Sequence, residues 1–249
     1  MPDLIFDMHT LFGPVPPRGG DTDPGHLQAL LKKHSIAGAV TLSTRGLYHS
    51  ASAGNRETVF HCNQIGPTLL PGVVLDPRQP QVIQTVAEAR VYFLLPRTQH
   101  WPIAYAPLQD LLQMRAVRTN TWPRPIPLWW EARQHGDATA IAELMRTVDY
   151  PAPYILGGVS GDGLVEAVSV ARKDANCMVA TDGLRGIGEV SLLVESLGAG
   201  RVIFGSGAPA QSLGSVLALV RQAGLSKADE ALILSGNAIR LLSKKATTA

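Results

Sequence analysis

Residues 201–209 read RVIFGSGAP, and residues 232–242 read LILSGNAIRLL. After Arg201, the apolar run in the first stretch predicts a buried strand, and Gly205, Ser206 and Gly207 then end it with small residues. The second stretch has the spacing of a helix. A buried strand that passes through a turn of small residues into helical sequence is the unit from which α/β folds are built.

The rest of the chain repeats this unit. Short apolar runs predict eight strands, at 4–6, 37–42, 69–75, 91–95, 126–130, 154–156, 177–180 and 201–204. Helical spacing follows at 51–65, 79–89, 105–117, 137–147, 163–173 and 190–197, and then at 211–223 and 226–243. Eight strand–helix pairs in 249 residues predict an α/β fold, a single-domain (β/α)8 TIM barrel over 1–249 with the helices of 211–243 packed on it.

One segment separates this prediction from its main competitor, an open doubly wound sheet. That fold binds dinucleotides through a GxGxxG loop after the first strand. Residues 7–17 instead read DMHTLFGPVPP. We therefore favour the barrel and expect the Pro- and Gly-rich run 13–25 to be a loop over its top.

The composition sets limits on partners and location. Hydrophobic residues make up 45% and charged residues 17%, with a formal net charge of +2. Such a balance gives no reason to expect a nucleic-acid or membrane-surface partner. Cys62 and Cys177 lie far apart without a CxxC context, which is typical of reduced thiols in a cytoplasmic protein. We expect no signal peptide and no membrane span.

Barrel enzymes place their reactive groups at the carboxyl ends of the strands, which here predicts two sets of candidates. His9, Glu131 and Asp182 are the candidates for proton transfer. Glu131 follows two tryptophans, and a desolvated carboxylate has a raised pKa that suits a general acid or base. Structural interpretations compete: His9 bonded to a neighbour, Glu131 paired with Arg133 or Arg97, and Asp182 in an Asp-Gly turn.

The second set would bind an acidic substrate. The candidates are Arg45, Arg97, Arg133, His100 and Ser206. Guanidinium groups bind carboxylates and phosphates through paired hydrogen bonds, and the N–H groups around Ser206 could point at an anion. The competing interpretations are that the arginines neutralise nearby carboxylates and that the glycines beside Ser206 only form a turn.

Several motifs together resemble one enzyme family. DMHTLFG (7–13), GNRETV (54–59), GVVLDPR (72–78) and ILGG (155–158), with the two opening stretches, are similar to the amidohydrolase superfamily and most of all to its decarboxylase-related branch. The resemblance implies a metal-dependent hydrolase or decarboxylase. Its usual ligands are a His-x-His pair on the first strand, one histidine on each of the fifth and sixth, and an aspartate on the eighth, with zinc or manganese as the metal.

Carried over to this sequence, most of those ligands are substituted. His9 keeps the first histidine, whereas Leu11, Gly158 and Gly207 stand at three other positions, and Glu131 aligns with the fifth-strand histidine. A catalytic zinc usually takes three protein ligands, and His9 and Glu131 supply at most two. The sequence therefore predicts no metal ligands and no cofactor, with a divalent metal such as zinc as the alternative.

Two functions stay open at this point. In the first, the protein is a hydrolase or decarboxylase that acts on a small acidic metabolite, a carboxylate or phosphate, at an atypical site. In the second, it is a non-catalytic protein of the same fold that binds a small ligand or a partner subunit, such as a second copy or a paralogue. A shared, solvent-reachable pocket for His9, Glu131 and Asp182 would favour the enzyme. If hydrophobic side chains fill the mouth of the barrel, the end at which the carboxyl ends of the strands lie, or if arginines pair with the carboxylates, the binding protein would be favoured.

Overall fold

A computed structural model describes residues 4–15, 20–79, 88–118 and 126–243. One sheet runs through the chain in the order β2-β1-β3-β4-β5-β6-β7-β8-β9. Its strands are β1 (Phe6–Val15), β2 (Gly20–Thr22), β3 (Gly38–Ser43), β4 (Leu69–Val74), β5 (Val91–Leu94), β6 (Leu128–Glu131), β7 (Tyr154–Gly157), β8 (Cys177–Ala180) and β9 (Val202–Ile203). All neighbours pair in parallel except β1 and β2, which form an antiparallel ribbon.

The two ends of the parallel sheet meet. The Met8 N–H donates to the Phe204 carbonyl at 2.9 Å, and the Leu11 N–H donates to the Ala208 carbonyl at 2.7 Å. The Gly207 N–H donates to the His9 carbonyl at 2.8 Å, so the segment after β9 also closes on β1. The predicted single-domain α/β barrel is thereby confirmed, with β2 as an added strand on β1.

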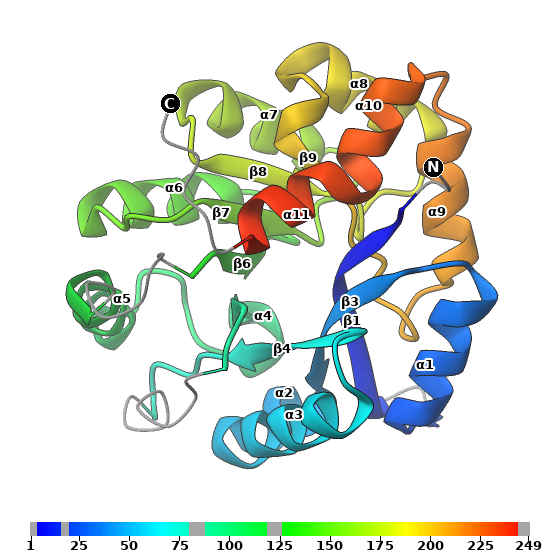
Figure 1. Ribbon diagram of the computed structural model, residues 1–249. Helices are drawn as coiled ribbons and strands as arrows, with labels where there is room; N and C mark the ends of the chain where they lie inside the picture. The colour runs from blue at the N-terminus through cyan, green and yellow to red at the C-terminus, as the bar shows by residue number, and fades with distance from the viewer. Residues whose placement is uncertain (1–3, 16–19, 80–87, 119–125, 244–249) are drawn as a thin grey trace.

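Helices surround the strands (Figure 1). In chain order they are α1 (Pro24–Lys33), α2 (Thr44–Tyr48), α3 (Ala51–Ile65), α4 (Pro96–Gln99), α5 (Ala106–Arg118), α6 (Asp137–Val148), α7 (Gly163–Lys173), α8 (Ile187–Leu197), α9 (Leu213–Arg221), α10 (Lys227–Ala231) and α11 (Asn237–Leu242). A π-helical turn over 232–236 joins α10 to α11. None of the described helices has both the length and the apolar character needed to span a membrane.

The motifs that suggested the fold hold it together through buried amides. The Asn55 side chain accepts from the Val74 N–H at 2.9 Å and donates to the Val74 carbonyl at 3.0 Å, which ties α3 to β4. Asn237 donates to the carbonyls of Ala199 and Val202 at 2.8 and 2.7 Å, which ties α11 to the start of β9. Both amides are almost fully buried, so each bond forms away from competing water.

Two predictions about the first third of the chain need correction. The first strand covers Phe6–Val15 rather than 4–6, so the chemistry-bearing residues lie within it instead of after it. The run 13–25 is not only a loop, because its described parts form the end of β1, β2 and the first turn of α1. The polar and glycine residues hid this ribbon, which has no continuous apolar run. The helix predicted at 79–89 falls mostly outside the described residues.

Candidate active site

Strand β1 carries the central histidine. The pairing of β1 with β3 shifts by one residue between Asp7 and Thr10, and such a bulge re-aims the side chains it contains. His9 Nδ1 lies 3.1 Å from Asp182 Oδ2, and the other oxygen, Oδ1, accepts the Gly158 N–H at 2.8 Å. Both side chains are nearly buried. The structure therefore brings two of the three proton-transfer candidates together, and His9 Nε2 has no hydrogen-bond partner among the described residues.

Aromatic rings enclose the histidine. The ring centroid of His9 lies 4.9 Å from that of Trp129 and 5.3 Å from that of Phe93. Phe93 and Trp129 are themselves 5.6 Å apart, and both are almost fully buried. They belong to the cluster of hydrophobic side chains that fills the inside of the barrel. The imidazole thus sits against an apolar wall on one side and a carboxylate on the other.

Trp129 reaches across the barrel into space that two glycines leave open. A Cβ atom at Gly157 on β7 would lie 2.3 Å from Trp129 Nε1, and one at Gly205, just after β9, would lie 2.7 Å from Trp129 Cη2. Real Cβ atoms do not come this close to other heavy atoms. The indole ring therefore fills the space that side chains at Gly157 and Gly205 would need. The sequence did not reveal this, because the three residues lie in three separate strand–helix units.

Asp7 is a further acidic group of the site that was not among the sequence-predicted candidates. Its Oδ1 accepts the N–H groups of His9 at 3.0 Å and Ser206 at 2.9 Å, whereas its Oδ2 has no partner among the described residues. Complete burial raises the pKa of Asp7 to about 6, against the lowering effect of these hydrogen bonds. The signal that could have found it is its position two residues before His9, at the end of an apolar run.

Glu131 is held away from this group by other partners. Its carboxylate accepts the backbone N–H of Thr98 at 2.9 Å and the Thr98 hydroxyl at 3.0 Å. Arg133 Nε lies 2.6 Å from Glu131 Oε1, so the pairing that competed with a catalytic role is present. Arg97 instead makes two hydrogen bonds to Asp137. Glu131 therefore anchors α4, the short helix after β5.

The candidate anion-binding residues are spread around the mouth. Arg45 lies 3.7 Å from Glu57, and His100 is exposed at the end of α4. Ser206 is fully buried, and its N–H points at a carboxylate of the protein itself, that of Asp7. The guanidinium groups of Arg97 and Arg133 are paired but remain about half exposed.

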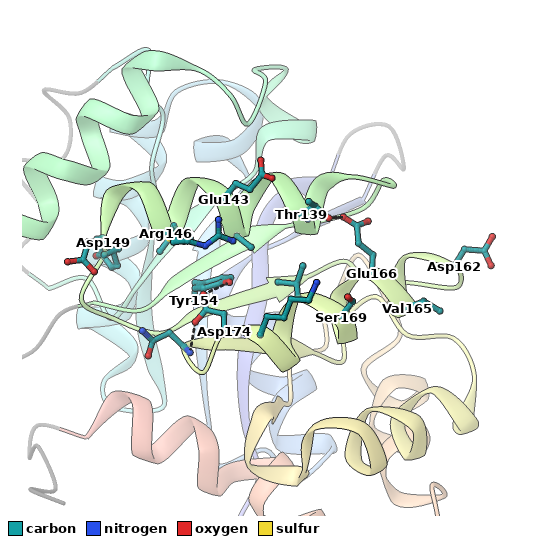
Figure 2. Close-up of a pocket in the computed structure, with 16 residues that line it drawn as sticks. Thr139, Glu143, Arg146, Asp149, Tyr154, Asp162, Val165, Glu166, Ser169 and Asp174 are labelled. Carbon is teal, nitrogen blue, oxygen red and sulfur yellow. Dashed lines mark hydrogen bonds between the residues drawn. The ribbon is translucent and has the colours of Figure 1, made fainter.

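A separate cavity lies on the flank of the barrel rather than at the mouth. It has a volume of about 840 Å³ and runs between α6 and α7, with Tyr154 at its base and Arg146 and Glu166 along its sides (Figure 2). The Tyr154 hydroxyl donates to Asp174 at 2.9 Å. Basic and acidic side chains line it together, and none of its lining residues belongs to the predicted site.

Comparisons with known proteins bear on the fold. No protein-family model matches the chain, and a search of curated proteins found no match. An uncharacterised TIM-barrel protein from Bordetella bronchiseptica superposes with a TM-score of 0.73 at 14% identity, over 96% of this chain and 98% of that one. Amidohydrolase 2 from Bifidobacterium longum subsp. infantis gives 0.64 at 13%, over 97% and 99%. A 5-carboxyvanillate decarboxylase from Novosphingobium aromaticivorans gives 0.67 at 11%, over 96% and 97%.

The comparisons correct one prediction. The decarboxylase from Novosphingobium aromaticivorans contains bound manganese and a nitrobenzoic acid derivative. The prediction that no cofactor is involved is therefore wrong, because proteins of this fold do bind a divalent metal. That prediction rested only on the substituted family positions, and it gave no weight to Asp7, whose buried Oδ2 lacks a described partner.

These similarities extend over almost the full length of each chain, while the sequence identities are between 11% and 14%. Such values show a shared fold. The sequence resemblance is thus confirmed at the level of the fold: the chain has the TIM-barrel fold that this amidohydrolase and this decarboxylase also have.

Proposed function

We propose that this protein is a hydrolase or decarboxylase that acts on a small acidic metabolite, with His9 as its proton-transfer group. The observation that carries the proposal is the contact of 3.1 Å between His9 Nδ1 and Asp182 Oδ2, with Nε2 left without a described partner. A histidine that a carboxylate holds through one nitrogen, with its other nitrogen unpaired, is the arrangement used by general bases, and here the unpaired Nε2 is buried.

The contacts assign a role to each group. The Asp182 carboxylate accepts a hydrogen bond from the Nδ1–H of His9, which leaves Nε2 as the acceptor nitrogen and holds the ring in place. The Gly158 N–H in turn holds Asp182. Nε2 is then the atom that takes a proton from an attacking water in hydrolysis. In decarboxylation, Nε2 would first take up a proton from solvent and would then deliver it to the carbon atom whose bond to CO₂ breaks. Burial raises the pKa of Asp7 to about 6, which makes it a second buried group that could take up or release a proton at mildly acidic pH.

Two donor atoms of the site bear on whether it could hold a divalent metal. Asp7 Oδ2 and His9 Nε2 are buried oxygen and nitrogen atoms without described partners, and these donor types suit zinc or manganese. Among the described residues, however, no three His, Cys, Asp or Glu side chains gather closely enough to hold an ion. These two atoms could supply part of a metal site, which usually takes three protein ligands, so a bound divalent metal would need further ligands.

A specific observation favours the second function, a binding protein without catalysis. Trp129 fills the space between β6, β7 and β9, and Glu131 and Asp137 are both paired with arginines. A filled interior and neutralised carboxylates suit a protein that presents the mouth to a ligand or subunit. The buried His9–Asp182 pair has no role in that function, which is why we place it second.

Activity measurements with matched variants test the proposal. Purified protein, as isolated and after addition of manganese or zinc, is assayed for CO₂ release and for hydrolysis of amides and esters over a panel of small aromatic and aliphatic carboxylates. We expect turnover that falls at least about a hundredfold in His9→Gln and in Asp182→Asn. His49→Gln, an exposed histidine at the end of α2, is the control and should match the parent protein.

Two results would contradict the proposal. One is turnover that survives in folded His9→Gln, which would place the chemistry elsewhere. The other is the absence of turnover with every substrate and metal in a protein that binds some of the same carboxylates, which would favour the non-catalytic function.

A further inference from the structure

Three arginines follow three strands on one side of the barrel mouth. Arg97, Arg133 and Arg185 come after β5, β6 and β8, and we call them the arginine arc. Contacts connect the last two: Arg133 packs against Gly158, whose N–H donates to Asp182, and Arg185 donates to the Asp182 carbonyl at 3.3 Å. Arg185 therefore contacts the backbone of Asp182, the residue that holds His9, and Arg133 lies beside the Gly158 that binds the Asp182 carboxylate.

Arg97 and Arg133 are each held by a buried carboxylate. The side chains of Arg97 and Arg133 are 42% and 56% exposed, whereas those of their partners Asp137 and Glu131 are 1% and 4% exposed. Each carboxylate is thus buried beneath its guanidinium group. Arg97 uses Nε and one terminal nitrogen for Asp137, and Arg133 uses Nε for Glu131. Their remaining N–H groups have no partner among the described residues, so they can donate to a ligand.

Arg185 is anchored by neutral groups. Its side chain donates to the carbonyls of Leu184 at 2.8 Å and Asp182 at 3.3 Å. The carboxylate of Glu189 fixes the loop by accepting the backbone N–H groups of Arg185 and Gly186. Among the described residues, no carboxylate lies within ion-pair distance of the Arg185 guanidinium, although the Glu189 carboxylate interacts with its charge from farther away, and backbone carbonyls set its position.

Preorganised guanidinium groups bind carboxylate and phosphate at low cost in side-chain entropy. Each guanidinium group of the arc is held by a different partner at the end of a different strand, β5, β6 or β8. These separate anchors hold the three positive charges at separate places, so more than one anionic group is needed to pair with all of them. We infer that the arginine arc binds a ligand with at least two anionic groups, carboxylate or phosphate, and so sets the substrate class of the proposed reaction.

This inference rests on the proposed function for the position of the reacting group over His9, but its test needs no turnover. Binding is measured by isothermal titration calorimetry with acetate, succinate and glutarate, and with inorganic phosphate and pyrophosphate. We expect ligands with two anionic groups to bind at least about tenfold more tightly than those with one. The carboxylate and phosphate series then show which of the two chemistries the arc prefers.

Variants link the binding to the arc. Arg133→Gln and Arg185→Gln should each weaken the two-group ligand about tenfold or more and leave acetate nearly unchanged. Arg146→Gln, on the exposed face of α6 away from the mouth, is the control and should bind as the parent does. Circular dichroism confirms that each variant is folded.

The outcomes separate this inference from the proposed function. Equal affinity for one-group and two-group ligands, no binding of any probe, or unchanged binding in both folded variants would overturn the inference. Preferential binding of a two-group ligand without any turnover would leave the inference in place and count against the proposed function. Turnover that depends on His9, in a protein that does not prefer two-group ligands, would support the proposed function and overturn the inference.

Discussion

Trp129 and the glycines opposite it allow a quantitative test of how the barrel interior is built. Removing the indole in Trp129→Ala should cost about 3–5 kcal/mol of unfolding free energy, since a large buried ring leaves a cavity. Adding a methyl group in Gly157→Ala should cost about 1–3 kcal/mol or more, because the new Cβ would lie 2.3 Å from Trp129 Nε1. The backbone of Gly157 does not require positive φ, so this cost is steric.

The two changes should compensate each other in the double variant. With the indole gone, the methyl group of Gly157→Ala enters the cavity, and the double variant should be more stable than the sum of the single effects by about 1–3 kcal/mol. Urea unfolding followed by far-ultraviolet circular dichroism measures all four proteins without relying on tryptophan emission. Gly163→Ala is the matched control, because a Cβ there meets no atom within 4 Å.

For the control pair, Gly163→Ala with Trp129→Ala, the changes in unfolding free energy should be additive within about 0.5 kcal/mol. If the Gly157 pair were equally additive, the indole would not pack against Gly157, and the interpretation of the barrel interior would be refuted. The same result would remove the main observation that favours a non-catalytic function.

The remaining predictions concern buried polar groups. Folding raises the pKa of Asp7 from 3.8 to about 6, so the protonated carboxyl group favours the folded state at low pH. As the pH rises from about 4 to about 6, the free energy of unfolding should therefore fall by about 3 kcal/mol. Asp7→Asn should lack this part of the pH dependence in urea midpoints, whereas the exposed Asp162→Asn should keep it. Asn237→Ala should lower the free energy of unfolding by about 2–4 kcal/mol in the same assay, because two buried carbonyls lose their hydrogen-bond donor. Asn237→Asp should be no more stable than Asn237→Ala. A loss below about 0.5 kcal/mol in Asn237→Ala would contradict the assigned hydrogen bonds. Arg97→Ala should cost about 1–3 kcal/mol by leaving Asp137 buried without its cation, and adding Asp137→Asn should recover part of the loss.

The sequence determined the fold to a large extent. Strands buried on both faces appear as continuous apolar runs, which is why the predicted run 177–180 coincides with β8 and the helical segments 51–65 and 163–173 coincide with α3 and α7. The first strand escaped this signal because β1 is rich in polar residues and continues into a ribbon with β2.

For the site, the sequence determined which residue types stand at the strand ends, and His9 and Asp182 followed from their positions. Only the tertiary structure decided the partners. His9 pairs with a residue 173 positions away, Glu131 binds Thr98 and Arg133, and Arg97 turns to Asp137 instead. Periodicity tells which face of a strand a side chain occupies, but the pairing of charges depends on loop conformation, rotamers and the volume left by residues such as Gly157 and Trp129, which are set by packing between distant parts of the chain.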